Sequence, residues 1–377
     1  MKKILIISQQ SNKSGAARFL LNIFSEIKED PNIELQFILN QYQESAKEFT
    51  DKFNTKYFIL DRFKVTRYFK YRVKLYDDLK TLWFRKIVKN FNPDLIYINT
   101  VAYNPLSKYI VENDFKYILH VHETDGTLIR SKHAAYIEKL IKKAFLVIGC
   151  AKYVSQFIVS NYKARNVKTI HEAINVDRFA NGKLVSFKKL NGFSEKNQII
   201  GVTGTPQKRK GTDIFIKAAI RFNQQNPDNN FLFIWLGGTT KSNDNKFYKK
   251  CLYILKESGY NNILLLNQID RVEDFYKDLD LFIIPSREDP FPLSMLEAMY
   301  FKVPVIGAKV SGIPEALDDN CGELFKSEDI EGLTELFEKF VNDRPRFLKN
   351  SENAYIKFVN NYTVKKISPE LKKVLLA

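Results

Sequence analysis

Short apolar runs alternate with stretches of helical composition along the chain, from its first residues onward. Runs such as Lys3 to Ile7 and Ile33 to Leu39 are rich in isoleucine and leucine, which predicts buried strands. Strands that alternate with helices favour open parallel sheets covered by crossover helices. Because 377 residues exceed what one hydrophobic core usually organises, the sequence predicts two α/β domains of this kind.

The same alternation predicts the order of the remaining elements. Further strands are expected at 57–60, 93–100, the start of 117–126, 144–149, 199–205, 231–236, 263–266 and 279–285. Helices are expected up to residue 28 and at 76–89, 155–162, 212–222, 295–300, 328–341 and 351–377. A shift toward Lys, Asn and Gly between residues 181 and 196 marks a linker, so the first domain is expected to end near residue 180.

The stretch Ser286–Glu297 joins a predicted strand to a predicted helix and is dense in chemical groups. Its two prolines suit a loop that enters a helix, because a first-turn proline lacks an N–H that would have no partner there. The amides from Leu293 onward and the positive end of the helix dipole predict a site for a phosphate-bearing ligand. Asp289 and Glu297 add two carboxylates, one of which can accept two hydroxyl hydrogen bonds, as a ribose offers. Taken alone, such a pair is more often two solvated carboxylates.

The sequence continues as Glu297-Ala-Met-Tyr-Phe-Lys-Val-Pro-Val-Ile306 and Ser311-Gly-Ile-Pro-Glu315. With this continuation the chain resembles the retaining family 4 glycosyltransferases, strongly from about Gly201 to Gly322 and loosely before that. The resemblance implies the GT-B fold, in which two Rossmann-like domains face each other across a cleft. It also implies that Asp289 contacts the donor sugar and that Glu297 holds the nucleotide ribose.

The domain roles follow from the same resemblance. Residues 1–180 are expected to form the acceptor-side domain, residues 181–357 the domain that binds the nucleotide sugar, and a helix at about 358–377 to cross back. The implied activity is a metal-independent, retaining transfer of a sugar from a nucleotide-diphosphate sugar to a glycan or lipid-linked acceptor. Bacterial surface polysaccharide synthesis is the expected setting, and no cofactor or metal is expected.

A basic loop, Pro206-Gln-Lys-Arg-Lys-Gly211, follows a strand end that contains a glycine. Arginine grips phosphate with two donors and lysine acts as a point charge, although three consecutive basic residues are usually just a solvated loop. By resemblance to the family's Arg-Lys-Gly, Arg209 and Lys210 are expected on the donor diphosphate. The other residues expected to bind the donor are Phe291, Leu293, Ser294, Gly204 and Ile269.

This part of the chain departs from the family at two positions. Thr205 stands where many relatives have a basic residue, which leaves Lys208 as the candidate for that phosphate contact. Lys302 stands where relatives usually have glycine. If its φ is positive, lysine costs about 1 kcal/mol there.

In the first domain, the loop containing Ser14 and Gly15 precedes a predicted helix, and it is expected to face the donor phosphates and the acceptor. His120 and His122 lie two residues apart on a strand, so their side chains face the same side. A lone histidine there is more often a satisfied structural group. The resemblance places His122 against the donor sugar and leaves His120 behind it.

The formal charge of +16 indicates an anionic partner. Residues 62–74 interleave six Lys and Arg with aromatic side chains, a pattern typical of an anionic membrane surface and equally of a solvated helix. Three separated cysteines indicate a reducing cytoplasm and no metal site. No run is long enough to span a membrane, and the apolar stretch of the first residues stops at Ile7, as in a buried strand. The expected location is cytoplasmic, with peripheral binding to the inner face of the membrane through 62–74.

Two other functions remain open at this stage. One is a basic protein that binds nucleic acid or membrane and catalyses no reaction. The sequence has no nucleic-acid-binding signature, however, and nucleic acid is not expected as a partner. The other is a sugar-nucleotide epimerase with the same GT-B fold. The sequence does not specify the sugar, the base, the acceptor or the oligomeric state.

Overall fold

The computed structural model describes residues 1–9, 11, 14–58, 73–179, 184–238, 246–318 and 320–377, which divide into two compact units. Unit 1 comprises Met1–Asn175 and Val364–Ala377, and unit 2 comprises Val176–Thr363. The first division therefore lies at Asn175 rather than near residue 180. The chain returns to unit 1 at Val364 rather than near residue 358.

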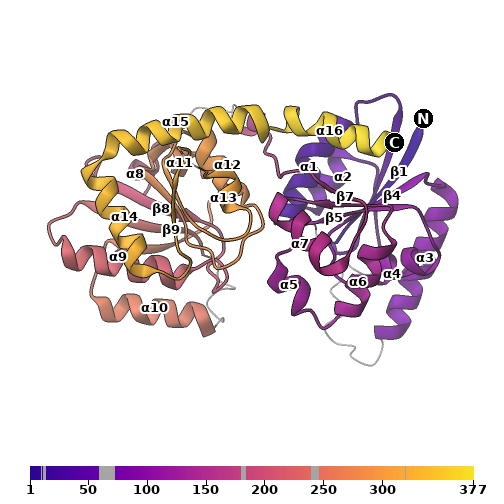
Figure 1. Cartoon of the computed structure of the whole chain (residues 1–377), viewed down its shortest axis with the longest axis horizontal. Helices are drawn as coiled ribbons and strands as arrows, with labels where there is room; N and C mark the ends of the chain where they lie inside the picture. The colour runs from indigo at the N-terminus through magenta and orange to yellow at the C-terminus, as the bar shows by residue number, and fades with distance from the viewer. Residues whose placement is uncertain (10, 12–13, 59–72, 180–183, 239–245, 319) are drawn as a thin grey trace. The chain divides into compact units, whose positions relative to one another are not determined.

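Unit 1 is a parallel sheet with helices on its faces (Figure 1), in the strand order β3-β2-β1-β4-β5-β6-β7. The strands are β1 (Lys2–Ser8), β2 (Ile33–Leu39), β3 (Thr55–Tyr57), β4 (Leu95–Asn99), β5 (Tyr117–Val121), β6 (Leu146–Gly149) and β7 (Val167–Thr169). The helices are α1 (Gly15–Ile27), α2 (Ala46–Lys52), α3 (Val73–Phe91), α4 (Pro105–Glu112), α5 (Asp125–Ile129), α6 (Ala134–Lys143), α7 (Lys152–Tyr162) and α16 (Val364–Leu376).

Unit 2 is a second parallel sheet, in the strand order β10-β9-β8-β11-β12-β13. The strands are β8 (Gln198–Thr203), β9 (Phe231–Gly238), β10 (Ile263–Asn267), β11 (Leu281–Ile284), β12 (Val305–Ala308) and β13 (Glu323–Phe325). The helical segments are η4 (Val176–Phe179), α8 (Phe187–Leu190), α9 (Thr212–Gln225), α10 (Lys246–Ser258), α11 (Val272–Asp278), α12 (Leu293–Tyr300), α13 (Ile313–Ala316), α14 (Ile330–Asn342) and α15 (Arg344–Asn361).

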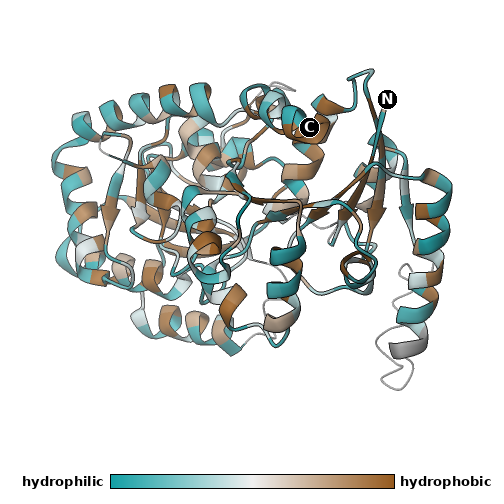
Figure 2. Cartoon of the chain, turned by 45° about the vertical axis from the view of Figure 1, so that its right-hand side comes forward, coloured by the Kyte–Doolittle hydropathy of each residue, from teal (hydrophilic) through white to brown (hydrophobic). Residues whose placement is uncertain are grey.

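Each sheet lies in the hydrophobic core of its own unit, and the strands are its most apolar elements (Figure 2). The C-terminal helix α16 completes the core of unit 1. It packs against α1 and buries Ile367, Leu371 and Leu375 there. The Val364 amide donates to the carbonyl of Ile174, which fixes the start of α16 to the end of the first part of unit 1.

The strand order of each sheet reverses direction at one point, between β1 and β4 in unit 1 and between β8 and β11 in unit 2. The chain leaves two neighbouring strands in opposite directions there, so a crevice opens at their carboxyl ends. Ligands of open α/β sheets bind at such points. The loops after β1, β4, β8 and β11 are therefore where each unit offers a site.

Most of the predicted strands are confirmed, but the strand expected at 57–60 is β3 at Thr55–Tyr57, and β7, β12 and β13 were not predicted. The helices differ at more positions. The helix expected over 351–377 is two helices, α15 and α16, interrupted at residues 362 and 363. Residues 59–72 lie outside the described part, and with them most of the basic segment 62–74. In the described part of the chain, every helix is too short or too polar to cross a bilayer.

Lys302 adopts a left-handed conformation with φ of 56°, directly after α12. Two backbone bonds close this helix end, from the Lys302 amide to Met299 and from the Val303 amide to Ala298. Lysine in this conformation costs about 1 kcal/mol relative to glycine. Its ammonium group pairs with Glu352 at 2.9 Å, on the surface.

Candidate active site

The basic loop of unit 2 lies directly on the end of β11. Gly211 has a φ of +76°, and a Cβ on it would lie 1.8 Å from the Pro285 carbonyl oxygen. Only glycine fits such an approach. The Arg287 amide donates to the Arg209 carbonyl at 2.7 Å, which joins the loop after β8 to the loop after β11.

The Arg287 side chain fastens the same two loops. Its guanidinium donates to both oxygens of Asp213 at 2.8 and 2.9 Å, to the Lys208 carbonyl at 2.7 Å and to Glu328 at 2.5 Å. Burial acts to raise the pKa of Asp213, but the hydrogen bonds and charge of Arg287 outweigh burial and leave that pKa below its ordinary value. A bidentate arginine–carboxylate pair of this kind restricts the geometry of the basic loop at residues 206–211.

Lys210 and Asp289 form an ion pair between the two loops. The Asp289 side chain is 6% exposed, and it also accepts from the Ser286 hydroxyl at 3.4 Å. Arg209 reaches the same carboxylate at 4.0 Å and donates to the Glu288 carbonyl at 2.7 Å. The structure therefore brings together the three predicted residues Arg209, Lys210 and Asp289, as one cluster of charges at the carboxyl ends of β8 and β11.

A small pocket opens beside this cluster. Its polar lining comes from the ends of β8 and β11, from the basic loop and from the first turn of α12: Thr203, Lys210, Ser286, Asp289 and Ser294. Leu293 begins α12, after Pro292 in the capping position. Phe291 is buried and packs against the ring of Tyr362, so its side chain supports the loop while the amides that follow it belong to the helix start.

Glu297 lies on α12 and is held by two side chains that the sequence analysis did not select. Arg178, from η4, forms an ion pair with Glu297 Oε1. The Tyr276 hydroxyl donates to Oε2 at 2.9 Å and lies 2.9 Å from the Thr203 hydroxyl. These contacts place the Glu297 carboxylate close to the end of β8, near the pocket.

The two remaining residues that were predicted to bind the donor, Gly204 and Ile269, do not line this pocket. Gly204 has a φ of +130°, and its carbonyl accepts from the Trp235 indole at 2.6 Å, so it shapes the end of β8. Ile269 follows β10, which is separated from β8 by β9. Among the described residues, Ile269 is not part of the pocket lining.

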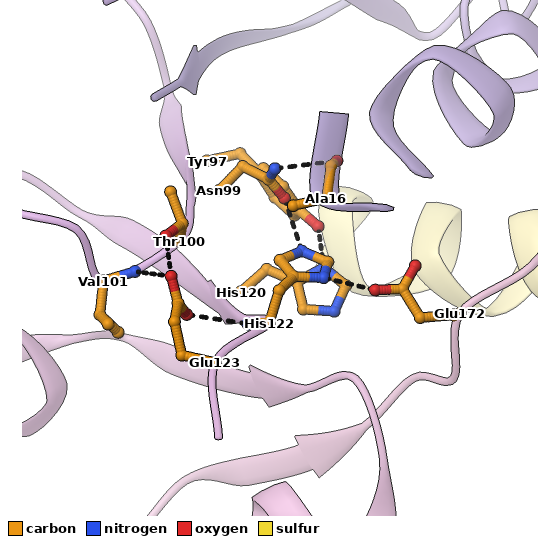
Figure 3. Close-up of polar contacts among 9 residues, drawn as sticks. All are labelled: Ala16, Tyr97, Asn99, Thr100, Val101, His120, His122, Glu123 and Glu172. Carbon is orange, nitrogen blue, oxygen red and sulfur yellow. Dashed lines mark hydrogen bonds and ion pairs between the residues drawn. The ribbon is translucent and has the colours of Figure 1, made fainter. Parts of the chain in front are cut away.

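In unit 1, His122 follows β5 and lies at the centre of a polar network (Figure 3). Its Nδ1 is 2.6 Å from Glu172 Oε1 and its Nε2 is 2.7 Å from Asn99 Oδ1. The Asn99 amide nitrogen donates to the Ala16 carbonyl at 3.1 Å. Since Ala16 is in the first turn of α1, this network ties His122 to the helix that follows the predicted loop of Ser14 and Gly15.

The residues next to His122 also form hydrogen bonds. Its amide and the Val101 amide donate to the carboxylate of Glu123, which also bonds the Thr100 hydroxyl. Burial raises the pKa of Glu123, although His122 and these amides act to lower it. His120 lies behind His122, with ring centroids 4.0 Å apart and its Nδ1 2.5 Å from the Tyr97 hydroxyl.

Three side chains of unit 1 have the atoms that could ligate a metal ion. Atoms of His122, Cys150 and Glu172 lie within 4.8 Å of one another. Both ring nitrogens of His122, however, already face oxygen acceptors at hydrogen-bond distance. The arrangement therefore fits a hydrogen-bonded network better than a set of metal ligands.

The buried His120 predicts an acid-sensitive unit 1. Burial, and then the charge of His122, hold the pKa of His120 well below its ordinary value. Below about pH 6.5 the unfolded chain binds a proton that folded His120 does not, so stability falls as pH falls. Melting temperatures between pH 8 and pH 5.5 should fall less steeply for His120→Asn than for the wild type. His133→Asn, on a partly exposed ring, is the control, and an equal slope for His120→Asn would contradict the assignment.

Comparison with known proteins identifies relatives of both the sequence and the fold. Residues 186–357 match the family "Glycosyl transferases group 1". The lipopolysaccharide core biosynthesis mannosyltransferase LpsB of Rhizobium meliloti is 26% identical over 47% of this chain and 51% of its own length. The alpha-galactosylglucosyldiacylglycerol synthase of Streptococcus pneumoniae is 24% identical over 56% of this chain and 59% of its own length. The chain thus spans little more than half the length of these curated relatives.

The whole chain is similar to solved structures. The crystal structure of Anabaena HepE in complex with UDP and glucose superposes with a TM-score of 0.81, at 19% identity, over 100% of both chains. The structure of WaaG, a glycosyltransferase involved in lipopolysaccharide biosynthesis, superposes with a TM-score of 0.73, at 14% identity, over 99% of both chains. At these identities the likeness establishes the fold.

Proposed function

We propose that the chain transfers a sugar from a nucleotide-diphosphate sugar to a glycan or lipid-linked acceptor. The match of residues 186–357 to glycosyl transferases group 1 and the GT-B fold of the whole chain support this proposal. The observation that carries the proposal is the small pocket of unit 2, where the charged side chains of Lys210 and Asp289 meet the start of α12 beside apolar strand residues. Relatives named for lipopolysaccharide and glycolipid synthesis support an acceptor of that class. Surface polysaccharide synthesis in the bacterial cytoplasm is the proposed setting.

The ion pair between Lys210 and Asp289 suggests how a donor would enter. Without a ligand, the cation and the acid neutralise each other. A diphosphate carries more negative charge than a carboxylate, so it would replace Asp289 as the partner of Lys210. Asp289 would then be free to accept hydrogen bonds from hydroxyl groups of the donor sugar.

The reaction we propose retains the configuration of the sugar. The bond from the sugar C1 to the diphosphate oxygen breaks, and a bond from C1 to the acceptor oxygen forms on the same face. The acceptor's proton passes to the leaving phosphate oxygen. Lys210, Arg209 and the amides at the start of α12 would stabilise the charge that develops on the leaving group.

The remaining predicted residues have supporting roles in this proposal. Glu297 would hold the ribose, and His122 would contribute from unit 1 near the donor sugar. The loop containing Ser14 and Gly15 would face the donor phosphates and the acceptor. Binding of an anionic membrane through residues 62–74 stays a prediction, because nearly all of that segment lies outside the described residues.

A donor screen tests the proposed function. Purified protein is heated with UDP, GDP or ADP sugars at fixed salt, and a specific donor at a hundred times its Kd should stabilise the fold by about 2.7 kcal/mol. The corresponding nucleoside monophosphates and an oligonucleotide of equal charge are the controls. Sugar transfer to a lipid-linked glycan is then measured with the stabilising donor. The proposal would be contradicted if the oligonucleotide stabilised the protein against heat and no nucleotide sugar did.

Removal of divalent metal ions should leave transfer unchanged. In the proposed mechanism, the charge that opposes the leaving diphosphate comes from Arg209, Lys210 and backbone amides. Initial rates with the identified donor should agree, within error, in excess EDTA and in excess Mg²⁺ or Mn²⁺. A rate that disappears in EDTA and returns with added metal would overturn the metal-independent mechanism.

A further inference from the structure

The imidazole ring of His122 has an oxygen acceptor at each nitrogen (Figure 3). At Nδ1 the acceptor is the carboxylate of Glu172, 2.6 Å away. An ionised carboxylate only accepts hydrogen bonds, so the contact requires a hydrogen on Nδ1. With Glu172 ionised, this contact excludes the tautomer that carries its single hydrogen on Nε2.

The acceptor at Nε2 is fixed by the backbone of α1. The side-chain amide of Asn99 is 3.1 Å from the Ala16 carbonyl, and a carbonyl oxygen only accepts. The amide must therefore turn Nδ2 toward Ala16 and Oδ1 toward His122, where Oδ1 lies 2.7 Å from Nε2. This second contact requires a hydrogen on Nε2 as well, and a ring with hydrogens on both nitrogens is an imidazolium.

We propose that Glu172 and Asn99 hold His122 as an imidazolium, so that His122 serves as a fixed cation of unit 1 and not as a general base. Glu172 is then a positioning residue that acts through His122. This inference goes beyond the proposed function, and only its kinetic consequence rests on that function. Glu172 comes from the segment after β7, 50 residues from His122, so the pair exists only in the folded unit.

The surroundings of the ring agree with one positive charge there. The side chains of His122 and Glu172 are each 5% exposed, and a buried charge is tolerated when an opposite charge is bonded to it. Glu172 Oε2 has no hydrogen-bond partner among the described residues, so His122 is the main partner of this carboxylate. The titratable groups that face the ring from the neighbouring elements are Glu172, Glu123, His120, Cys150 and, behind His120, Tyr97.

The two adjacent histidines have separate charge states in this arrangement. Burial keeps the pKa of His120 low, and the nearby charge of His122 lowers it further. His120 is therefore neutral where His122 is charged, which avoids two like charges at a centroid distance of 4.0 Å. Glu123 bonds the backbone of His122 and leaves the ring nitrogens to Glu172 and Asn99.

The charge state of His122 is measured directly by NMR of the full chain labelled with ¹⁵N-histidine. At pH 7.5 the wild type should show one ring with hydrogens on both nitrogens, and this signal should be absent from His122→Asn. In Glu172→Gln the His122 ring should become neutral at the same pH. The matched control is Glu123→Gln, which removes a partly buried carboxylate next to the same residue and should keep the imidazolium. If Glu172→Gln does not fold, Asn99→Leu serves as the second variant and should also give a neutral ring.

A neutral His122 ring in the wild type at pH 7.5 would overturn the proposal, as would an unchanged imidazolium in Glu172→Gln. Kinetics add a second readout once a donor is known. In Glu172→Gln, kcat should fall roughly tenfold relative to the wild type between pH 6 and pH 7.5, as an ordinary imidazole loses its proton. A wild type without any transferase activity would contradict the proposed function, and the NMR result would still decide this inference.

Discussion

Replacing Lys210 by alanine should lower kcat for sugar transfer by about 10²- to 10³-fold, the usual loss when one fixed charge or donor that stabilises the transition state is removed. Lys210 lines the pocket of unit 2 and already binds an anion there, the carboxylate of Asp289. In the proposed mechanism, the negative charge on the diphosphate grows as the sugar leaves, so the missing cation affects the transition state more than the bound donor. The measurement is initial rates over a range of donor concentrations at constant ionic strength.

The control for Lys210→Ala is Lys217→Ala, which removes the same charge from an exposed position on α9. It should leave both kcat and the donor KM within about a factor of two, since exposed charges at a distance are screened. Asp289 is buried and loses its closest cation in Lys210→Ala, so the melting temperature is measured alongside. If Lys210→Ala folds and keeps the wild-type kcat, Lys210 does not stabilise the transition state.

Local patterns in the sequence were sufficient to predict most of the sheets. β2 was predicted with the bounds Ile33–Leu39 that the structure has, because apolar runs between polar turns depend on neighbouring residues alone. The phosphate-binding role of the basic loop came from its resemblance to the family's Arg-Lys-Gly and stays a prediction. The structure adds a physical reason for Gly211, which is its close approach to the Pro285 carbonyl. The division of the C-terminal segment into α15 and α16 was missed, because both halves have helical composition.

The residues that the sequence analysis missed are partners across long separations. Arg178 and Glu297 are 119 residues apart, and Arg287 and Asp213 are 74 apart. A single sequence contains no signal that joins such residues, since their proximity depends on how the strands are ordered. Glu172 was closer to being found. It is an acid directly before the apolar pair Ala173 and Ile174, and a buried acid needs a partner.

Glu297→Ala should raise the donor KM by about 10- to 100-fold, because hydrogen bonds to a charged group contribute about 1.5–3 kcal/mol. In the proposed complex, the carboxylate binds the ribose in both the ground state and the transition state, so kcat should fall less than the donor affinity does. Steady-state rates with the identified donor, together with its Kd from calorimetry, separate the two effects.

The contacts of Glu297 provide the matched variants that make this test specific. Tyr276→Phe removes the hydroxyl that donates to Oε2 and leaves the carboxylate in place, so its KM should change by only a few fold. Arg178→Ala removes the ion pair at Oε1. If Arg178 only orients Glu297, the double variant Arg178→Ala/Glu297→Ala should bind the donor no worse than Glu297→Ala alone. Additive losses would show that Arg178 contacts the donor independently. If Glu297→Ala folds and its donor KM is unchanged, Glu297 does not bind the ribose. Nothing else in that variant replaces the lost carboxylate.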